Sequence, residues 1–239
     1  MGECALYAAV KARVTQLEQR QAAQQAFARQ LLESQEGERK RIASELHDSL
    51  GQNLLVIKNR ALLQALSLPD EHGRTQFTEF SDAVSQTLEE VRTISYDLRP
   101  SHLDQLGLRT ALVAMIEKVS ASSTIQFTHA VDELDGLLRP GDDITLYRIA
   151  QECLNNILKH SGATRAALNL AVHAGELELT IRDDGRGFMR DEEMHPRAGF
   201  GLNSIAERVR ILGGTHEIES APGRGTTITL RIALKDKRR

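Results

Sequence analysis

A histidine stands beside an aspartate in a stretch of helical composition, and this pair could carry nucleophilic chemistry. His47 is followed by Asp48, and Gln52 lies five residues after the histidine. A carboxylate can accept a hydrogen bond from one imidazole nitrogen and leave the other nitrogen as a nucleophile. Gly51 lies one helical turn after His47 and offers no side chain to block an approaching phosphate. A surface histidine beside a solvated aspartate is the alternative that this pair alone leaves open.

Three glycine-rich segments in the second half of the chain could form an anion site. They are residues 183–187, 199–202 and 223–226. Glycine lets backbone N–H groups approach an anion, and the second segment runs into a helix predicted to begin near Leu202, whose N-terminus carries partial positive charge. Each segment alone also fits an ordinary turn. With the acidic Asp183 at the start of the first segment, the three together predict a nucleotide site.

An acid and an amide lie one turn apart on the helix predicted over residues 144–160. Glu152 and Asn156 are four residues apart and therefore share a face. Such a pair can support a hydrated Mg²⁺ ion and the phosphates attached to it. A polar helix face with an internal hydrogen bond is the alternative. Cys153 falls on the neighbouring face and is predicted to lie in the core.

Composition and charge exclude several classes of protein. The 239 residues are 41% apolar and 26% charged, and the net charge of -3 gives no electrostatic footprint for nucleic acid. No apolar run reaches the roughly 18 residues of a membrane span. The two cysteines are far apart in sequence and indicate neither a disulfide framework nor a zinc site, so we expect a reducing, cytoplasmic location.

The elements that must position these residues differ between the two halves. A helix rich in Ala, Gln, Glu and Leu is predicted over residues 6–66, and a second amphipathic helix over residues 77–98 ends before Pro100. The first helix carries an apolar stripe with spacings of 4, 4, 4, 3 and 4, made of Ile42, Leu46, Leu50, Leu54, Ile57 and Ala61. A lone hairpin cannot cover both apolar faces, so we expect two hairpins to pair as a four-helix bundle. Residues 1–36 fit either a signalling coiled coil or a monomeric helix.

The second half mixes strands and helices and predicts a separate α/β domain. Helices are predicted over residues 108–119, 144–160 and 203–212, and strands over residues 124–130, 166–172, 177–182, 215–219 and 226–232. The predicted organisation is an N-terminal helix over 1–36, a helical hairpin over 37–100, a hinge over 101–107, an α/β domain over 108–234 and a basic tail over 235–239.

These motifs resemble those of two-component sensor histidine kinases of the nitrate/nitrite-sensor and desaturase-thermosensor type. The His-Asp-x-x-x-Gln motif of that family reads His47-Asp48-Ser49-Leu50-Gly51-Gln52, and Glu38-Arg39-x-Arg41-Ile42-Ala43 precedes it as in the family. The segment from Leu98-Arg99-Pro100 to Leu106-Gly107-Leu108 looks like the family's junction. The second half is similar to the Bergerat-type α/β sandwich that binds ATP in gyrase, the Hsp90 chaperones and MutL. The resemblance runs from about residue 36 to residue 232.

The resemblance implies a role for each matching residue. His47 is autophosphorylated by ATP, Asp48 is its acid/base partner, and Gln52 positions a water for dephosphorylation of the partner regulator. Asn156 binds Mg²⁺, and Asp183 binds the adenine amino group. The further residues implied to bind ATP are Glu152, Asn155, Lys159, His160, Gly185, Gly187, Gly199, Gly201, Leu202, Gly223, Gly225 and Thr226.

The resemblance also implies partners. They are a second copy of the chain, forming a homodimer, and a response regulator with a receiver domain and a helix-turn-helix output domain. No direct contact with nucleic acid is expected, and a membrane enters only through a missing or separate sensor segment. Two rival functions remain at this stage. One is a dimerisation module that binds nucleotide as a conformational ligand, and the other is a serine-directed kinase or an ATPase of the wider superfamily.

Overall fold

The computed structural model describes residues 2–134, 136–189 and 200–234, and the chain divides into two compact units. We call Met1–Ser101 the hairpin unit and His102–Arg239 the sheet unit. The predicted fold class, a helical part followed by a mixed α/β sheet, is confirmed.

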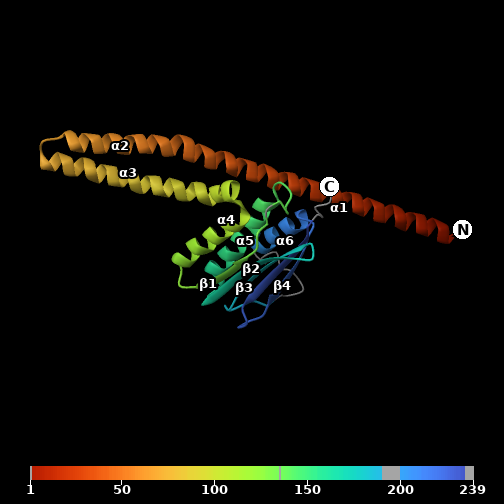
Figure 1. Cartoon of the computed structure of the whole chain (residues 1–239). Helices are drawn as coiled ribbons and strands as arrows, with labels where there is room; N and C mark the ends of the chain where they lie inside the picture. The colour runs from red at the N-terminus through yellow and green to blue at the C-terminus, as the bar shows by residue number, and fades with distance from the viewer. Residues whose placement is uncertain (1, 135, 190–199, 235–239) are drawn as a thin grey trace. The chain divides into compact units, whose positions relative to one another are not determined.

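The hairpin unit is a long helical path that turns back once on itself. Helix α1 (Gly2–Glu45), the π-helical segment η1 (Leu46–Gly51) and α2 (Gln52–Ser67) follow one another without a break, and α3 (Glu71–Leu98) returns alongside them (Figure 1). Asp70 caps α3, because its carboxylate accepts a hydrogen bond from the Gly73 backbone N–H at 2.7 Å. The two helices are thereby joined by a tight turn.

We call the continuous run of α1, η1 and α2 the first path. Its side chains pack on branched side chains of α3. The buried residues of this seam are Ala43, Ala61, Ala65, Ser81, Val84, Leu88 and Val91. Several apolar side chains of the predicted stripes stay exposed, among them Phe80 (51%) and Ile94 (53%) on α3, and Leu50 and Ile57 on the first path. The hairpin therefore covers only part of its own apolar surface.

The sheet unit is built on one five-stranded sheet in the order β1-β2-β3-β5-β4. The strands are β1 (Gln126–Val131), β2 (Arg165–His173), β3 (Glu176–Asp183), β4 (Thr215–Ser220) and β5 (Thr226–Ala233). The β1/β2 pair is parallel and the other pairs are antiparallel. The remaining elements are α4 (Ser101–Ala121), α5 (Asp142–Asn156), the π-helical η2 (Ile157–Ser161) and α6 (Phe200–Ile211).

Helices α4, α5 and α6 cover one face of the sheet (Figure 1). Buried residues alternate along β2 and β3, as expected for strands with one face on a core. The largest fully buried side chains are Tyr147, Leu112, Ile116, Leu146, Ile149, Leu154, Leu168, Leu170, Leu177, Leu179, Ile205 and Leu230. This core fixes the ends of α5, β3 and β5, which carry most of the predicted nucleotide-site residues.

The three helices of the sheet unit differ from their predicted bounds. The helix predicted over 108–119 is preceded by a helical turn from Ser101, and Gly107 breaks the two at φ 80°, ψ 173°, a conformation that glycine adopts without strain. The helix predicted over 144–160 is α-helical to Asn156 and π-helical beyond it. Helix α6 begins at Phe200, so Leu202 lies inside its first turn. Within the described residues, no helix has the length and apolar character needed to cross a membrane.

Candidate active site

His47 and Asp48 lie in the π-helical segment η1, in the hairpin unit. His47 Nδ1 is 3.1 Å from Asp48 Oδ1, and the histidine side chain is 73% exposed. Neighbouring side chains on an α-helix diverge by about 100° and do not face each other. The wider π winding narrows that angle and lets the two side chains meet.

The exposed Asp48 carboxyl group is ionised at neutral pH, because its pKa lies far below 7. The bond with His47 and then the bond donated by Ser44 Oγ, at 2.9 Å to Oδ2, hold the pKa of Asp48 below its ordinary value. An ionised carboxylate can only accept hydrogen bonds, so His47 Nδ1 must carry the proton of this contact. In the neutral imidazole Nε2 then holds the free lone pair. The geometry thus assigns Nε2 as the nucleophilic atom.

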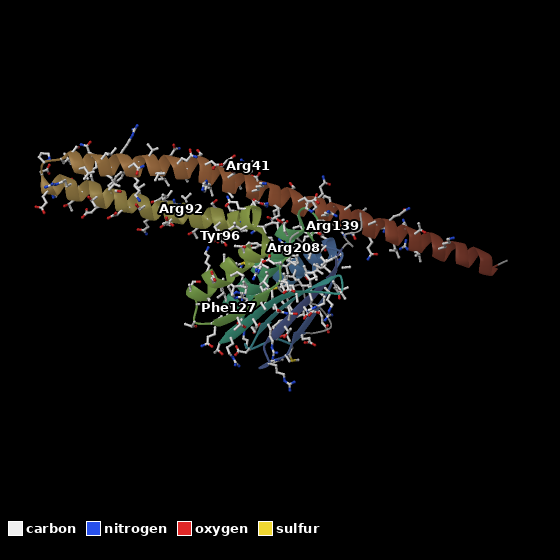
Figure 2. The ribbon with its side chains drawn as sticks, in the orientation of Figure 1. Arg41, Arg92, Tyr96, Phe127, Arg139 and Arg208 are labelled. Atoms are coloured by element: carbon white, nitrogen blue, oxygen red, sulfur yellow. The ribbon has the colours of Figure 1, made fainter. Side chains whose placement is uncertain are left out.

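The charged residues around this pair are already engaged with one another. Arg41, labelled on its helix in Figure 2, pairs with Glu38 and with Glu45, the latter at 2.6 Å. These pairs leave Ser44 and His47 as the groups that act on the Asp48 carboxylate. Gln52 is exposed in the first turn of α2. Among the described residues its side chain has no hydrogen-bond partner that would hold it away from an incoming group.

The prediction that Gly51 opens a path for phosphate is wrong. A side chain at this position would point at Leu88 of α3, 3.9 Å away, and at the Leu46 carbonyl oxygen, 3.5 Å away. The π winding turns Gly51 toward the hairpin seam, because its longer turn shifts the phase of the residues that follow His47.

A buried carboxyl group marks the predicted adenine site in the sheet unit. Asp183 is 6% exposed, and its burial raises the pKa of its carboxyl group, an effect that backbone N–H bonds from Gly185 (2.9 Å) and Thr226 partly offset. Two carboxylate oxygens can accept about four hydrogen bonds. Acceptor capacity therefore remains for a ligand N–H group, as the exocyclic amine of adenine provides.

The first and third glycine segments meet at this carboxyl group. The Gly223 N–H donates to the Arg186 carbonyl at 2.7 Å, and Asp183 pairs with Thr226 across β3 and β5. Gly225 is buried at φ 72°, where a Cβ would collide with the Asp183 carbonyl oxygen. Gly187 and Gly185 lie in the same cluster, packed on Gly225 and on Ser161 respectively.

The second cluster joins α5 to the start of α6. A Cβ on Gly201 would collide with Glu152 Oε1 and lie 3.4 Å from Asn156 Nδ2, so Gly201 at the start of α6 lies directly against these two side chains of α5. Asn156 Nδ2 is buried without a hydrogen-bond partner among the described residues. Burial of an amide N–H group without a hydrogen-bond partner costs free energy. Rotation of the Asn156 side-chain amide would exchange its two ends and place the oxygen at this position instead. This donor set fits a phosphate-bound Mg²⁺ ion, whose preferred ligands are oxygens.

Other predicted site residues are placed less directly. Lys159 and His160 are exposed at the end of η2, and Asn155 is half-buried on α5. Leu202 packs against the hydrophobic core, so a structural role explains a leucine at this position without any contact with a ligand. Gly199 lies outside the described residues.

Sequence reasoning missed a structural carboxylate next to Asp183. Asp184 Oδ1 accepts hydrogen bonds from the backbone N–H groups of Thr164 and Arg165, each at 2.8 Å, and Oδ2 accepts from both side chains. These bonds lower the pKa of Asp184, the backbone bond from Arg165 having the largest effect. The first glycine segment is thereby tied to the start of β2. The adjacent pair of aspartates before a glycine was the available signal.

We expect Asp184→Asn to lower the thermal unfolding midpoint by a few degrees at pH 7, because an amide nitrogen cannot accept these bonds. The folded pKa is lowered, so the stabilisation is present above the ordinary pKa of about 3.9 and is lost as the pH falls through the folded pKa. The difference from wild type should therefore shrink below about pH 4. Circular dichroism melts measure it, with the exposed Glu217→Gln as control. Equal midpoints at pH 7 would contradict the anchoring role.

Two family models match the chain in the order of its units. The model described as "Histidine kinase" matches residues 38–103, which include His47. The model described as "Histidine kinase-, DNA gyrase B-, and HSP90-like ATPase" matches residues 141–236, which include Asn156 and Asp183. The chain belongs to the histidine kinase family. The resemblance inferred from the motifs is confirmed.

Known relatives of this histidine kinase family member carry matching names. It is 32% identical over 212 residues to the sensor histidine kinase MctS of Rhizobium johnstonii, covering 85% of this chain and 45% of MctS. It is 32% identical over 206 residues to the signal transduction histidine-protein kinase/phosphatase UhpB of Salmonella typhimurium, covering 85% of this chain and 41% of UhpB. The chain thus spans somewhat less than half the length of these two relatives.

A solved structure shares the fold of this family member. It is the histidine kinase domain of the blue-light activated histidine kinase of Erythrobacter litoralis, at a TM-score of 0.51 and 17% identity. The match covers 77% of this chain and 94% of that domain.

Proposed function

We propose that the chain is an ATP-dependent protein-histidine kinase whose phosphoacceptor is His47. The observation that carries this proposal is the 3.1 Å contact between His47 Nδ1 and Asp48 Oδ1, made by a histidine side chain that is 73% exposed. Membership in the histidine kinase family and the match of the sheet unit to an ATPase model support it.

In the proposed reaction Nε2 of His47 attacks the γ-phosphorus of ATP. A nitrogen–phosphorus bond forms, the bond from the γ-phosphorus to the bridging oxygen breaks, and ADP leaves with that electron pair. The imidazole becomes cationic, and Asp48 stabilises the positive charge through the Nδ1 proton. Transfer to an aspartate of a response regulator returns the neutral imidazole.

The nucleotide would be held by the clusters of the sheet unit. Asp183 would accept from the adenine amine, and the segments around Gly185 and Gly225 would form the surrounding wall. Asn156 and Glu152 would hold Mg²⁺, which supplies charge neutralisation at the phosphates when bound. The nucleotide must reach His47 of the same chain or of a second copy, and the glycine break at Gly107 supports a hinge in this region.

A homodimer is supported by the apolar residues that the hairpin leaves exposed. Leu50, Ile57, Phe80 and Ile94 are each more than two-fifths exposed. A second hairpin would cover them in a four-helix bundle. Phosphatase action toward the regulator is supported by the exposed Gln52, five residues after His47, and by the name of the relative UhpB.

The proposal is tested with the full chain, Mg²⁺ and γ-labelled ATP. We expect protein-bound label that is lost in acid and retained in alkali, because phosphohistidine is acid-labile and phosphoserine is not. ATP labelled at the α-phosphate is the control and should leave no label on the protein. Acid-stable label would favour a serine-directed kinase, and ATP binding without any label would favour a nucleotide-binding dimerisation module.

A further inference from the structure

Ser44 holds the half of the Asp48 carboxylate that His47 does not use. Its hydroxyl donates to Asp48 Oδ2 at 2.9 Å, while His47 Nδ1 meets Oδ1 at 3.1 Å. The three side chains form a chain of hydrogen bonds from Ser44 to His47 on one exposed surface of the helical path. The sequence motifs gave Ser44 no role.

This surface gives the carboxylate little other support. Asp48 is 64% exposed, and the terminal torsion of an aspartate is broad, so the carboxylate is free to rotate unless both oxygens are held. The neighbouring cation, Arg41, is taken up by Glu38 and Glu45. A neutral donor at Ser44 fixes the carboxylate without placing a positive charge beside it. The full negative charge of Asp48 then remains available to the imidazole.

We propose that Ser44 is a positioning residue for phosphorylation of His47, acting through Asp48. By holding Oδ2 it keeps Oδ1 on Nδ1, which favours the tautomer with the free lone pair on Nε2. The π winding of η1 brings Asp48 within reach of His47, and Ser44, one turn earlier at the end of α1, fixes the carboxylate there. The expected effect of Ser44 on the phosphorylation rate rests on the proposed kinase function. Its expected effect on the tautomer of the His47 imidazole does not depend on that function.

The test compares Ser44→Ala and Ser44→Thr with wild type in the full chain. We expect a roughly fivefold lower initial rate of acid-labile phosphate formation for Ser44→Ala at saturating ATP and Mg²⁺, with the KM for ATP unchanged, as one lost hydrogen bond gives. Ser44→Thr keeps the hydroxyl and should recover the rate to within about twofold. Alanine favours helix more than serine, so helix loss cannot explain a slower Ser44→Ala. Ser49→Ala, the same change within η1, is the matched control and should keep the wild-type rate.

The second readout is the ¹⁵N spectrum of the His47 ring without nucleotide, assigned by its loss in His47→Gln. We expect mainly the Nδ1–H tautomer in wild type and Ser44→Thr, and a shift toward the Nε2–H tautomer in Ser44→Ala. Wild-type tautomer populations in Ser44→Ala would overturn the inference, as would an unchanged rate. If wild type takes up no label, the kinase proposal fails, and the tautomer spectra alone decide the role of Ser44.

Discussion

His47→Gln is expected to abolish the acid-labile label while leaving ATP binding intact. Glutamine has a similar polarity but no lone pair on nitrogen that can attack phosphorus. The loss of label should be complete within the detection limit of the assay, because we expect no other side chain to replace His47 as the phosphoryl acceptor. The site that we propose for ATP is built from α5, β3, α6 and β5, so the Kd for ATP should stay within about twofold of wild type. Label uptake and ATP titration by calorimetry measure the two effects.

His72→Gln provides the matched control for this change. His72 is another exposed histidine of the hairpin unit, on α3, where its ring contacts Gln76 at 3.2 Å. This variant should label as wild type does. Persistent label in His47→Gln, or loss of label in His72→Gln, would contradict the assignment of the acceptor.

Gly225→Ala is expected to weaken ATP binding by at least about a hundredfold, which corresponds to about 2.7 kcal/mol. The residue is buried at φ 72°, and a Cβ would collide with the Asp183 carbonyl and lie 3.1 Å from the Asp184 Cα. Both contacts are to backbone, so relief requires β3 and the loop before β5 to separate. That movement displaces the Asp183 carboxyl group and breaks the hydrogen bond that it accepts from the Thr226 backbone N–H.

Gly175→Ala separates the cost of backbone conformation from the cost of the collision. Gly175 lies in the turn between β2 and β3 at φ 84°, and nothing lies within 4 Å of its added Cβ. Both variants should lose about 1–2 kcal/mol of stability from the left-handed backbone. Only Gly225→Ala should lose ATP affinity as well. Equal Kd values for the two variants, measured below their unfolding temperatures, would contradict the proposed site at Asp183.

The sequence motifs were sufficient to predict the order of elements and the family. Residue types at fixed spacing carried this information. Alternation of apolar residues predicted β2 and β3, and Pro100 predicted the end of α3. That the three glycine segments form one nucleotide site with Asp183 stays a prediction; in the structure the first and third segments are joined by the hydrogen bond from the Gly223 N–H to the Arg186 carbonyl.

The π-helical segments and the hydrogen bonds around them were not predicted. Standard helix periodicity places Gly51 beneath His47, whereas the structure turns it toward α3. A signal was present in the stripe from Ile42 to Leu54, which takes 12 residues for three turns where α winding takes about 10.8. The roles of Ser44 and Asp184 depend on distances that spacing alone does not give.

The path through η1 is about one residue longer than the hairpin's packing requires. Ala43, whose carbonyl accepts from Ser95 Oγ, and Gly51, whose added Cβ would point at Leu88, both lie on the α3 side although they are eight positions apart and two α turns take about 7.2. The longer winding of η1 changes the angle between His47 and Asp48, so the local length of this helical path bears directly on the contact that the proposed phosphoacceptor uses.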